Sequence, residues 1–264
     1  MIPADYLNFK NRGLWYKIKF ILLFAPSVLQ CYSFAKQHWV LGMYSESRKA
    51  TLTFISGLAG AKPDEIQEYL VEIESDRTFR RSLEEKRNSF DRGHYFSWGI
   101  GESLGKVLYA VYRRKKPDVI VETGVASGES SSYILCALEK NDRGELYSID
   151  LPWWDEEQSG WLIPDYLKHR WHLTLGRSSK KLTPLLKELG GIDIFLHDSD
   201  HSYENMLWEY QTAWAYLKDR GLLLSHNIDA NSAFGDFCRS VKAEGYLLGN
   251  MGGVIKTRQQ VRRV

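Results

Sequence analysis

The sequence predicts an α/β protein built around a mostly parallel sheet, and three observations lead to this prediction. After Pro117, short apolar runs rich in Val, Ile and Leu alternate with longer amphipathic stretches. Glycine or acidic residues follow several of these runs directly, as they do where a strand turns into a helix. Near the C-terminus, two further runs are separated only by a glycine-rich segment, which suggests an antiparallel hairpin. Compact apolar runs indicate strands buried on both faces by covering helices.

The N-terminal third is expected to be helical. Residues 1–60 have no clear periodicity, but Pro63-Asp64-Glu65 places a proline and two acids where a helix would begin. Ser75-Asp76 predicts a break and a new N-cap, and a charged helix then runs to about Asn88. We therefore predict a helical N-terminal extension over residues 1–92, followed by a second domain over residues 93–264.

Strands and helices alternate in the second domain. Strands are predicted at 119–121, 146–149, 171–175, 192–196 and 222–224. Helices are predicted at 130–138, 182–189, 203–217 and 234–243. The closing hairpin would pair 246–248 with 254–255 across the glycine-rich residues 249–253.

The composition is that of an ordinary globular chain. Its 264 residues are 44% hydrophobic and 26% charged, with a net charge of +2 at pH 7. These values argue against disordered, collagen-like and coiled-coil chains, and no basic excess points to nucleic acid as a partner. Three cysteines are too few for a disulfide scaffold, so we expect reduced thiols and a cytoplasmic protein. Nine Trp and fifteen Tyr either pack the core or line a binding surface.

The first fifty residues are basic and apolar, with Lys and Arg outnumbering acids. The apolar stretch 20–34 contains Pro26 and is too short to span a bilayer. Such a segment is typical of a helix on a membrane surface. The alternative, which we favour, is a helical arm that packs on the core or on a second subunit. We also expect a homo-oligomer.

A glycine loop follows the first predicted strand of the sheet. Residues 122–130 read Glu-Thr-Gly-Val-Ala-Ser-Gly-Glu-Ser, and glycines there let the backbone turn sharply and approach a ligand. Asp150 ends the next strand, where a carboxylate can accept both hydroxyls of an adenosine ribose. Ala126 stands where a dinucleotide loop has its middle glycine. The loop therefore favours S-adenosylmethionine over NAD.

A run of ionisable residues follows the fourth predicted strand. Residues 197–204 read His-Asp-Ser-Asp-His-Ser-Tyr-Glu, and they begin where an apolar run ends. Capping of the next helix explains one or two of these side chains, but not the whole run. Burying so many charges without a function would be costly. We therefore expect a functional site at this edge of the sheet.

These segments together resemble class I S-adenosylmethionine-dependent methyltransferases. The resemblance rests on residues 119–150, 198–204 and 217–224, and it extends over about residues 93–257. It is closest to the branch of macrocin-type sugar O-methyltransferases and cephalosporin hydroxylase proteins. It implies a Rossmann-like methyltransferase fold with a mostly parallel seven-stranded sheet, a C-terminal antiparallel hairpin and, here, a helical N-terminal extension. It also implies O-methylation of a small molecule, such as a sugar or a secondary metabolite.

The resemblance assigns roles to individual positions. It implies that Glu122, Gly124, Gly128 and Asp150 hold the methyl donor. To this set we add residues from the same loop, from the loop after the third strand and from the charged run, namely Ala126, Ser130, Gly176, Arg177, Ser178 and Asp198.

The family's Asp-x-x-His pattern implies a metal-binding carboxylate at Asp198 and a general base at His201. A histidine titrates near neutral pH, so it can remove a proton from a hydroxyl. After the fifth strand, Asn227 resembles the metal-binding asparagine of catechol-type enzymes, but His226 replaces an acid. The predicted metal ligands are Asp198, His226 and Asn227. The loss of one negative charge leaves open whether a divalent metal binds.

Three tryptophans follow Asp150 closely. Trp153, Trp154 and Trp161 are mixed with acidic residues, a combination that can bind a sugar ring or another flat, polar acceptor. The alternative is a loop that packs on its own domain.

Two other function classes stay open at this stage. One is an NAD-dependent oxidoreductase, which the glycine spacing disfavours. The other is a binding protein that keeps the fold without catalysis, since fold alone does not determine chemistry.

Overall fold

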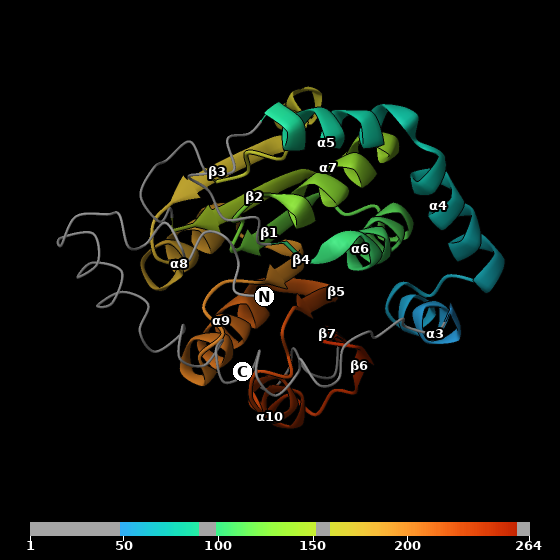
Figure 1. Cartoon of the computed structure of the whole chain (residues 1–264). Helices are drawn as coiled ribbons and strands as arrows, with labels where there is room; N and C mark the ends of the chain where they lie inside the picture. The colour runs from blue at the N-terminus through green and yellow to red at the C-terminus, as the bar shows by residue number, and fades with distance from the viewer. Residues whose placement is uncertain (1–47, 90–98, 152–158, 258–264) are drawn as a thin grey trace, which may run out of the picture.

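The computed structural model describes residues 48–89, 99–151 and 159–257, which form a sheet flanked by helices (Figure 1). The seven strands lie in the order β3-β2-β1-β4-β5-β7-β6. The strand bounds are β1 Val119–Thr123, β2 Glu145–Asp150, β3 Trp171–Leu175, β4 Ile192–His197, β5 Leu217–Ser225, β6 Gly245–Leu248 and β7 Met251–Ile255. Strands β1 to β5 are parallel, whereas β7 is antiparallel to both β5 and β6. The predicted mostly parallel sheet with a C-terminal hairpin is confirmed.

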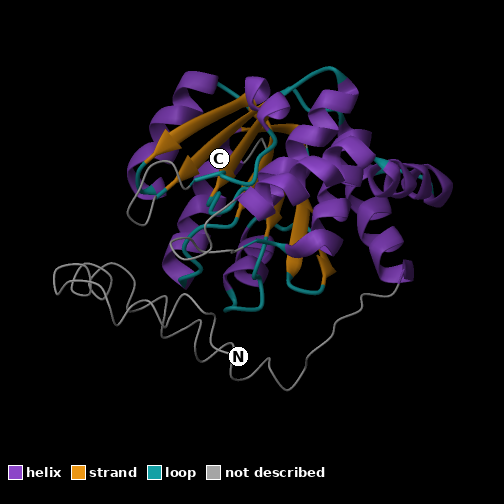
Figure 2. Ribbon diagram, turned by 45° about the horizontal axis from the view of Figure 1, so that its top comes forward, coloured by secondary structure: helices purple, strands orange, loops and turns teal. Residues whose placement is uncertain are grey.

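Helices cover both faces of the sheet, and each face has its own hydrophobic core (Figure 2). Because side chains alternate along a strand, Ile120 and Ile194 face one core, and Val121 and Phe195 face the other. Helices α6 and α7 belong to the first core, and α8, α9 and α10 to the second. The helix bounds are α6 Gly101–Lys115, α7 Glu129–Asn141, α8 Ser178–Leu189, α9 Tyr203–Tyr216 and α10 Ala233–Ser240, with a short 3-10 helix η4 at Asp165–Arg170.

The described part of the N-terminal region is helical, as predicted. It forms α3 Arg48–Ala59, α4 Pro63–Ser75 and α5 Arg77–Ser89. The break between α4 and α5 lies at Asp76, whose carboxylate accepts a hydrogen bond of 2.8 Å from the amide of Phe79. Apolar residues of all three helices pack into the same core as α6 and α7. A domain boundary near residue 93 stays a prediction.

Helix α6 is an element that the sequence analysis did not predict. All residues from 107 to 112 of this helix are buried, and Tyr109 and Tyr112 are among the largest fully buried side chains. Its sequence lacks a clear start signal, since Ile100 at the N-cap makes no side-chain capping bond. Tertiary packing against α4 and α7 therefore stabilises a helix whose ends are weakly marked in the sequence.

The hairpin turn is shorter than predicted. Residues 251–253 belong to β7, so Gly249-Asn250 alone connect the two strands. A β-carbon at Gly252 would lie 2.7 Å from Cζ of Phe234, and one at Gly253 would lie 2.6 Å from Cδ1 of Leu58. These glycines therefore serve close packing against the sheet, not the flexibility of a loop.

The predicted helix over 234–243 also ends early. It stops at Ser240, because Val241 leaves the helical region and Lys242 adopts a left-handed conformation with φ 53°. The preceding helix, α9, also ends one residue earlier than predicted, because Leu217 is extended and belongs to β5.

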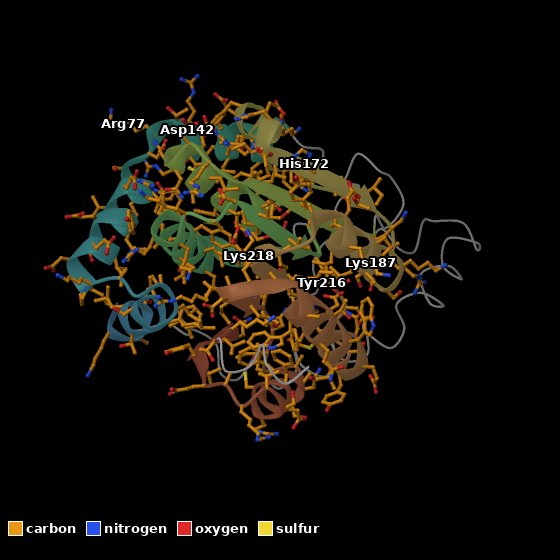
Figure 3. All side chains as sticks on the ribbon, turned by 180° about the vertical axis from the view of Figure 1, so that it is seen from behind. Arg77, Asp142, His172, Lys187, Tyr216 and Lys218 are labelled. Atoms are coloured by element: carbon orange, nitrogen blue, oxygen red, sulfur yellow. The ribbon has the colours of Figure 1, made fainter. Side chains whose placement is uncertain are left out.

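Other sequence expectations concern the surface and the thiols. Among the described residues, no helix combines the length and the apolar character needed to cross a membrane. Cys136 and Cys238 are free and buried, whereas Cys31 and the basic N-terminal arm lie outside the described residues. His172, labelled in Figure 3, lies on the edge strand β3. Its ring stacks on that of Tyr147, with the ring centroids 4.6 Å apart.

Candidate functional site

The candidate site lies where the carboxyl ends of β1, β2, β4 and β5 meet. These strands are neighbours in the sheet, so the residues that follow them come together although they are far apart in the sequence. Thr123 pairs with His197, and His197 pairs with Ser225, so the three strand ends are also level. The predicted glycine loop and the charged run thus begin side by side.

The glycine loop has a backbone that glycine makes possible. Gly124 and Gly128 both have φ 84°, and Ala126 between them has φ 47°. A β-carbon at Gly124 would lie only 2.1 Å from the backbone oxygen of Asp198. Gly124 therefore permits β1 and the loop after β4 to approach more closely than any other residue would.

A second segment, residues 160–162, lies against the glycine loop. The amide of Gly160 donates to the carbonyl of Ala126 at 2.9 Å, and the amide of Leu162 donates to that of Ser127 at 2.9 Å. A β-carbon at Gly128 would lie 2.8 Å from Cα of Gly160. Residues 160–162 are therefore attached to the glycine loop.

The Glu122 carboxylate lies under the glycine loop and is fully buried. It accepts hydrogen bonds from the hydroxyls of Ser130 and Ser131 at 2.6 Å, and from Ser148 at 2.9 Å. Burial outweighs these bonds and raises the pKa of Glu122 to about 7. Glu122 and Ser130 thus join β1, β2 and the first turn of α7, and they support the loop from within the protein.

Asp150 reaches the glycine loop from the end of β2. Its carboxylate accepts the amide of Val125 at 3.2 Å and the hydroxyl of Ser159. Burial raises the pKa of Asp150 in spite of these bonds. A carboxylate that accepts a side-chain hydroxyl in this way has the chemistry needed for a ribose hydroxyl.

The loop after β3, which carries the predicted donor-binding residues Gly176, Arg177 and Ser178, lies beside Asp150. The amide of Gly176 donates to the carbonyl of Asp150 at 2.7 Å, and Gly176 has φ 137°. Arg177 precedes Ser178, the first residue of α8. The Ser178 side chain contributes to lowering the pKa of the buried Glu209 carboxylate.

Glu209 is a central residue of the site that the sequence analysis missed. It lies in the middle of α9 and is fully buried. One oxygen accepts Thr123 at 2.5 Å and contacts Nδ1 of His197 at 2.6 Å. The other accepts Ser199 at 2.7 Å and Asn205 at 3.2 Å. Burial raises the pKa of Glu209, but His197 and these donors outweigh it, so the pKa is lowered.

The predicted catalytic residues lie together at the ends of β4 and β5. Oδ1 of Asp198 is 2.9 Å from Nδ1 of His226 and 3.4 Å from Nε2 of His201. Asn227 Nδ2 is 3.3 Å from the same His201 nitrogen. The structure therefore brings these four side chains together, whereas their predicted roles stay predictions, and Asn250 from the β6–β7 turn joins them.

The charges in this cluster are coupled. Burial raises the pKa of Asp198, but His226 and His201 outweigh it and hold the pKa well below its ordinary value. Burial lowers the pKa of His226, but the Asp198 carboxylate outweighs it, so the pKa is raised. Asp198 is therefore an ionised acceptor between two imidazoles.

The arrangement of these atoms is not that of a metal site. Asp198 already contacts both histidines, and the Asn227 oxygen accepts a hydrogen bond of 2.9 Å from Asn250. Among the residues that the structure describes, no three His, Cys, Asp or Glu residues are grouped to hold an ion. A divalent metal would have to displace these bonds.

The predicted acceptor residues are only partly described. Trp153 and Trp154 lie outside the described residues. Trp161 is half-buried and packs against the core that contains α6 and α7.

Comparison with known proteins finds a family model that matches the middle of the chain. Residues 121–228 match a family model described as a methyltransferase domain. None of the curated proteins compared with the chain matches it.

Solved structures share the fold at low identity. An O-methyltransferase from Bacillus cereus in complex with SAH has a TM-score of 0.52 and 14% identity, over 69% of this chain and 92% of its own. SAH-bound PaMTH1 from Podospora anserina has a TM-score of 0.52 and 16% identity, over 69% of this chain and 88% of its own. TomG from Streptomyces achromogenes in complex with SAM is an O-methyltransferase involved in tomaymycin synthesis. It has a TM-score of 0.53 and 16% identity, over 69% of this chain and 91% of its own.

Substitution of Gly124 by Ala should destabilise the protein more than the same change at Gly190. Both glycines have positive φ, but a β-carbon at Gly190 meets no atom within 4 Å. The Gly190→Ala control should therefore cost only about 1–2 kcal/mol of backbone strain. Gly124→Ala should cost about 1–3 kcal/mol more, because the loop after β4 must move. Urea unfolding measures both, and equal losses would contradict the close approach at Gly124.

The free energy of unfolding should contain a pH-dependent part that comes from Glu122. Its pKa of about 7 lies above the ordinary value of 4.5, so the folded protein binds this proton more tightly than the unfolded chain. The contribution is fully present below pH 4.5 and is lost as the pH rises through 7, a change of about 3 kcal/mol. Glu122→Gln, which cannot ionise, should lack this change. Identical pH dependence of urea unfolding in both proteins would refute the assignment.

Proposed function

We propose that this chain is a class I S-adenosylmethionine-dependent methyltransferase that transfers a methyl group to a hydroxyl oxygen of a small molecule, as the family match and the shared fold support. The observation that carries the proposal is the meeting of two halves of a site at one edge of the sheet. The glycine loop with Asp150 forms one half, and Asp198 with His201 forms the other. A sugar or a secondary metabolite is the proposed acceptor, and the cytoplasm the proposed compartment.

Binding of the methyl donor is the role of the first half. S-adenosylmethionine, when bound, supplies an activated methyl group on its sulfonium sulfur. Asp150 would accept the ribose hydroxyls, and the turn at Gly124 and Gly128 lets the backbone approach the rest of the donor. The Ser159 hydroxyl now occupies one Asp150 oxygen, so it would compete with a ribose hydroxyl or be displaced by it.

Removal of a proton is the role of the second half. A neutral hydroxyl is a poor nucleophile, and a base beside it makes attack on the methyl carbon faster. The imidazole of His201 is about one-fifth exposed, so a small molecule can reach it. Asp198 lies 3.4 Å from Nε2 and would stabilise the positive charge that proton uptake creates. The Asn231 side chain holds the backbone carbonyl of His201 at 2.9 Å.

The position of His201 supports its role as the base. It follows β4 by only a few residues, and the loop that carries it is attached to Glu209 through Ser199. The loop also lies against Gly124, which belongs to the donor half of the site. Base and donor loop are therefore held in one rigid arrangement, as in-line methyl transfer requires.

The function is tested directly by transfer of a labelled methyl group from S-adenosylmethionine to a panel of phenols, catechols and glycosides. Methylated products would support the proposal. Tight donor binding without product from any acceptor would favour a binding protein that keeps the fold.

Substitution of Asp150 by Asn should weaken binding of S-adenosylhomocysteine by about 10-fold or more, because a charge-assisted bond to the ribose is lost. Ser159→Ala should instead bind the same ligand as tightly as wild type or up to about 5-fold more tightly, because a competing hydrogen bond is removed. Isothermal titration calorimetry measures both. Unchanged affinity in Asp150→Asn would refute Asp150 as the ribose acceptor.

Substitution of His201 by Ala should lower kcat by about 100-fold or more without changing the affinity for S-adenosylhomocysteine, because only proton removal is lost. His172→Ala, at an exposed histidine on β3, is the matched control and should retain full turnover. Steady-state kinetics on an acceptor found in the panel give kcat. Turnover at the wild-type rate in His201→Ala would exclude it as the base.

A further inference from the structure

Helix α5 of the N-terminal region lies along α7, the helix that follows the glycine loop (Figure 1). The two helices run in opposite directions. Lys140 in the last turn of α7 pairs with Asp76 just before α5, with 2.9 Å between Nζ and Oδ2. Phe79 and Tyr133 pack edge to face between the helices, with ring centroids 5.0 Å apart. The C-terminal end of α5 therefore lies beside the first turn of α7, next to the glycine loop.

Glu129 is the residue that α5 contacts at this end. It directly follows Gly128, the last glycine of the loop, and it is the first residue of α7. Oε1 of Glu129 accepts a hydrogen bond of 2.9 Å from Nη2 of Arg87, and Oε2 accepts one of 2.9 Å from the amide of Gly101. The Glu129 side chain is only 13% exposed. Both carboxylate oxygens are thus held by segments that precede the sheet in the sequence.

Lys86, the residue before Arg87, reaches a second segment next to the glycine loop. Its Nζ lies 2.8 Å from Oδ1 of Asp165 at the start of η4. This 3-10 helix closely follows residues 160–162, two of whose amides donate to carbonyls of the glycine loop. The last turn of α5 is therefore attached to both segments that adjoin the loop.

The two ion pairs differ in how much depends on them. Asp165 is 73% exposed and also pairs with Lys168, so it keeps a partner when Lys86 is removed. Exposed pairs of this kind contribute little to stability. Glu129 is largely buried, and without Arg87 it would have no cation as a partner among the residues that the structure describes. A buried carboxylate without a counter-charge is costly, so it would turn toward water and shift the first turn of α7.

We propose that Arg87 is a positioning residue for the methyl donor, which fixes the first turn of α7 through Glu129 and thereby holds the end of the glycine loop. The inference rests on the proposed function, in which this loop binds S-adenosylmethionine. Arg87 acts through Glu129 and needs no contact with the donor. The N-terminal helical region is then a working part of the donor half of the site, because one of its side chains sets the shape of the loop.

The decisive variant is Arg87→Met, which removes the guanidinium and keeps the apolar part of the side chain. We expect the Kd for S-adenosylhomocysteine to rise by about 5- to 20-fold in isothermal titration calorimetry, because the loop loses its fixed end. The melting temperature should stay within about 3 °C of wild type, since Phe79 and Leu83 still bury α5 in the core. Arg87→Lys keeps the charge without the planar fork and should recover part of the affinity.

Two further residues of α5 provide matched controls. Arg81→Gln removes a pair with Glu85 in which both side chains are exposed, and it should leave the Kd unchanged. Lys86→Met should raise the Kd by less than about 2-fold, because Asp165 keeps Lys168.

A double variant tests whether Arg87 acts through Glu129. Arg87→Met combined with Glu129→Gln should bind S-adenosylhomocysteine no more weakly than Arg87→Met alone, because no carboxylate is left without its counter-charge. Losses that multiply in the double variant would show that the two side chains act separately, and would overturn the inference.

A second measurement needs no ligand. The amide of Gly128 donates to the carbonyl of Val125, and the amide of Ser132 donates to that of Gly128. Hydrogen exchange at these two amides should be faster in Arg87→Met than in the wild type, and unchanged in Arg81→Gln. Equal exchange in all three proteins would overturn the inference.

The binding outcomes separate positioning from folding and from the proposed function. Wild-type affinity in Arg87→Met overturns the inference and leaves the proposed function intact. A large fall in melting temperature with wild-type affinity in the folded protein also overturns it, since Arg87 would then serve only to hold α5 in place. If the wild type binds no S-adenosylhomocysteine at all, the proposed function fails and the inference fails with it.

Discussion

The buried carboxylate of Glu209 is the interaction on which the geometry of the site depends. A carboxylate without partners would be too costly to bury, so each of its oxygens is matched by donors from different segments. Those donors come from the end of β1, the end of β4 and the loop that carries His201. One charge in the middle of α9 thus holds three separate segments in a fixed relation, and the α9 helix, packed on the sheet, keeps that charge in place.

Glu122 has the corresponding role on the other face of the sheet. It is next to Thr123 in the sequence, and alternation along β1 sends the two side chains to opposite faces. Glu122 accepts hydrogen bonds from serine hydroxyls beneath the glycine loop, whereas Thr123 donates one to Glu209. The end of a single strand is therefore held from both sides by buried carboxylates, next to the glycine loop and to the loop that carries His201.

Much of this arrangement could be predicted from local patterns. The parallel strands are continuous apolar runs, and the glycine loop, Asp150 and the run from Asp198 to His201 all follow such runs directly. Glu209 could not be predicted in the same way, because an acid within a helix usually faces water and nothing nearby marks it as buried. Helix α6 was missed because packing stabilises it, and Asn250 because its neighbours come from a different strand end.

The sequence by itself determined the class of fold, the order of the strands along the chain, and which residues follow each strand, because these depend on short-range periodicity and on glycine. The tertiary structure alone decided which of those residues form hydrogen bonds with one another. Partners such as Asn250 and His226, or Glu209 and Thr123, are far apart in the chain and meet only after the sheet has formed. A hydrogen bond requires a donor and an acceptor at a defined distance, and only the packed sheet sets that distance.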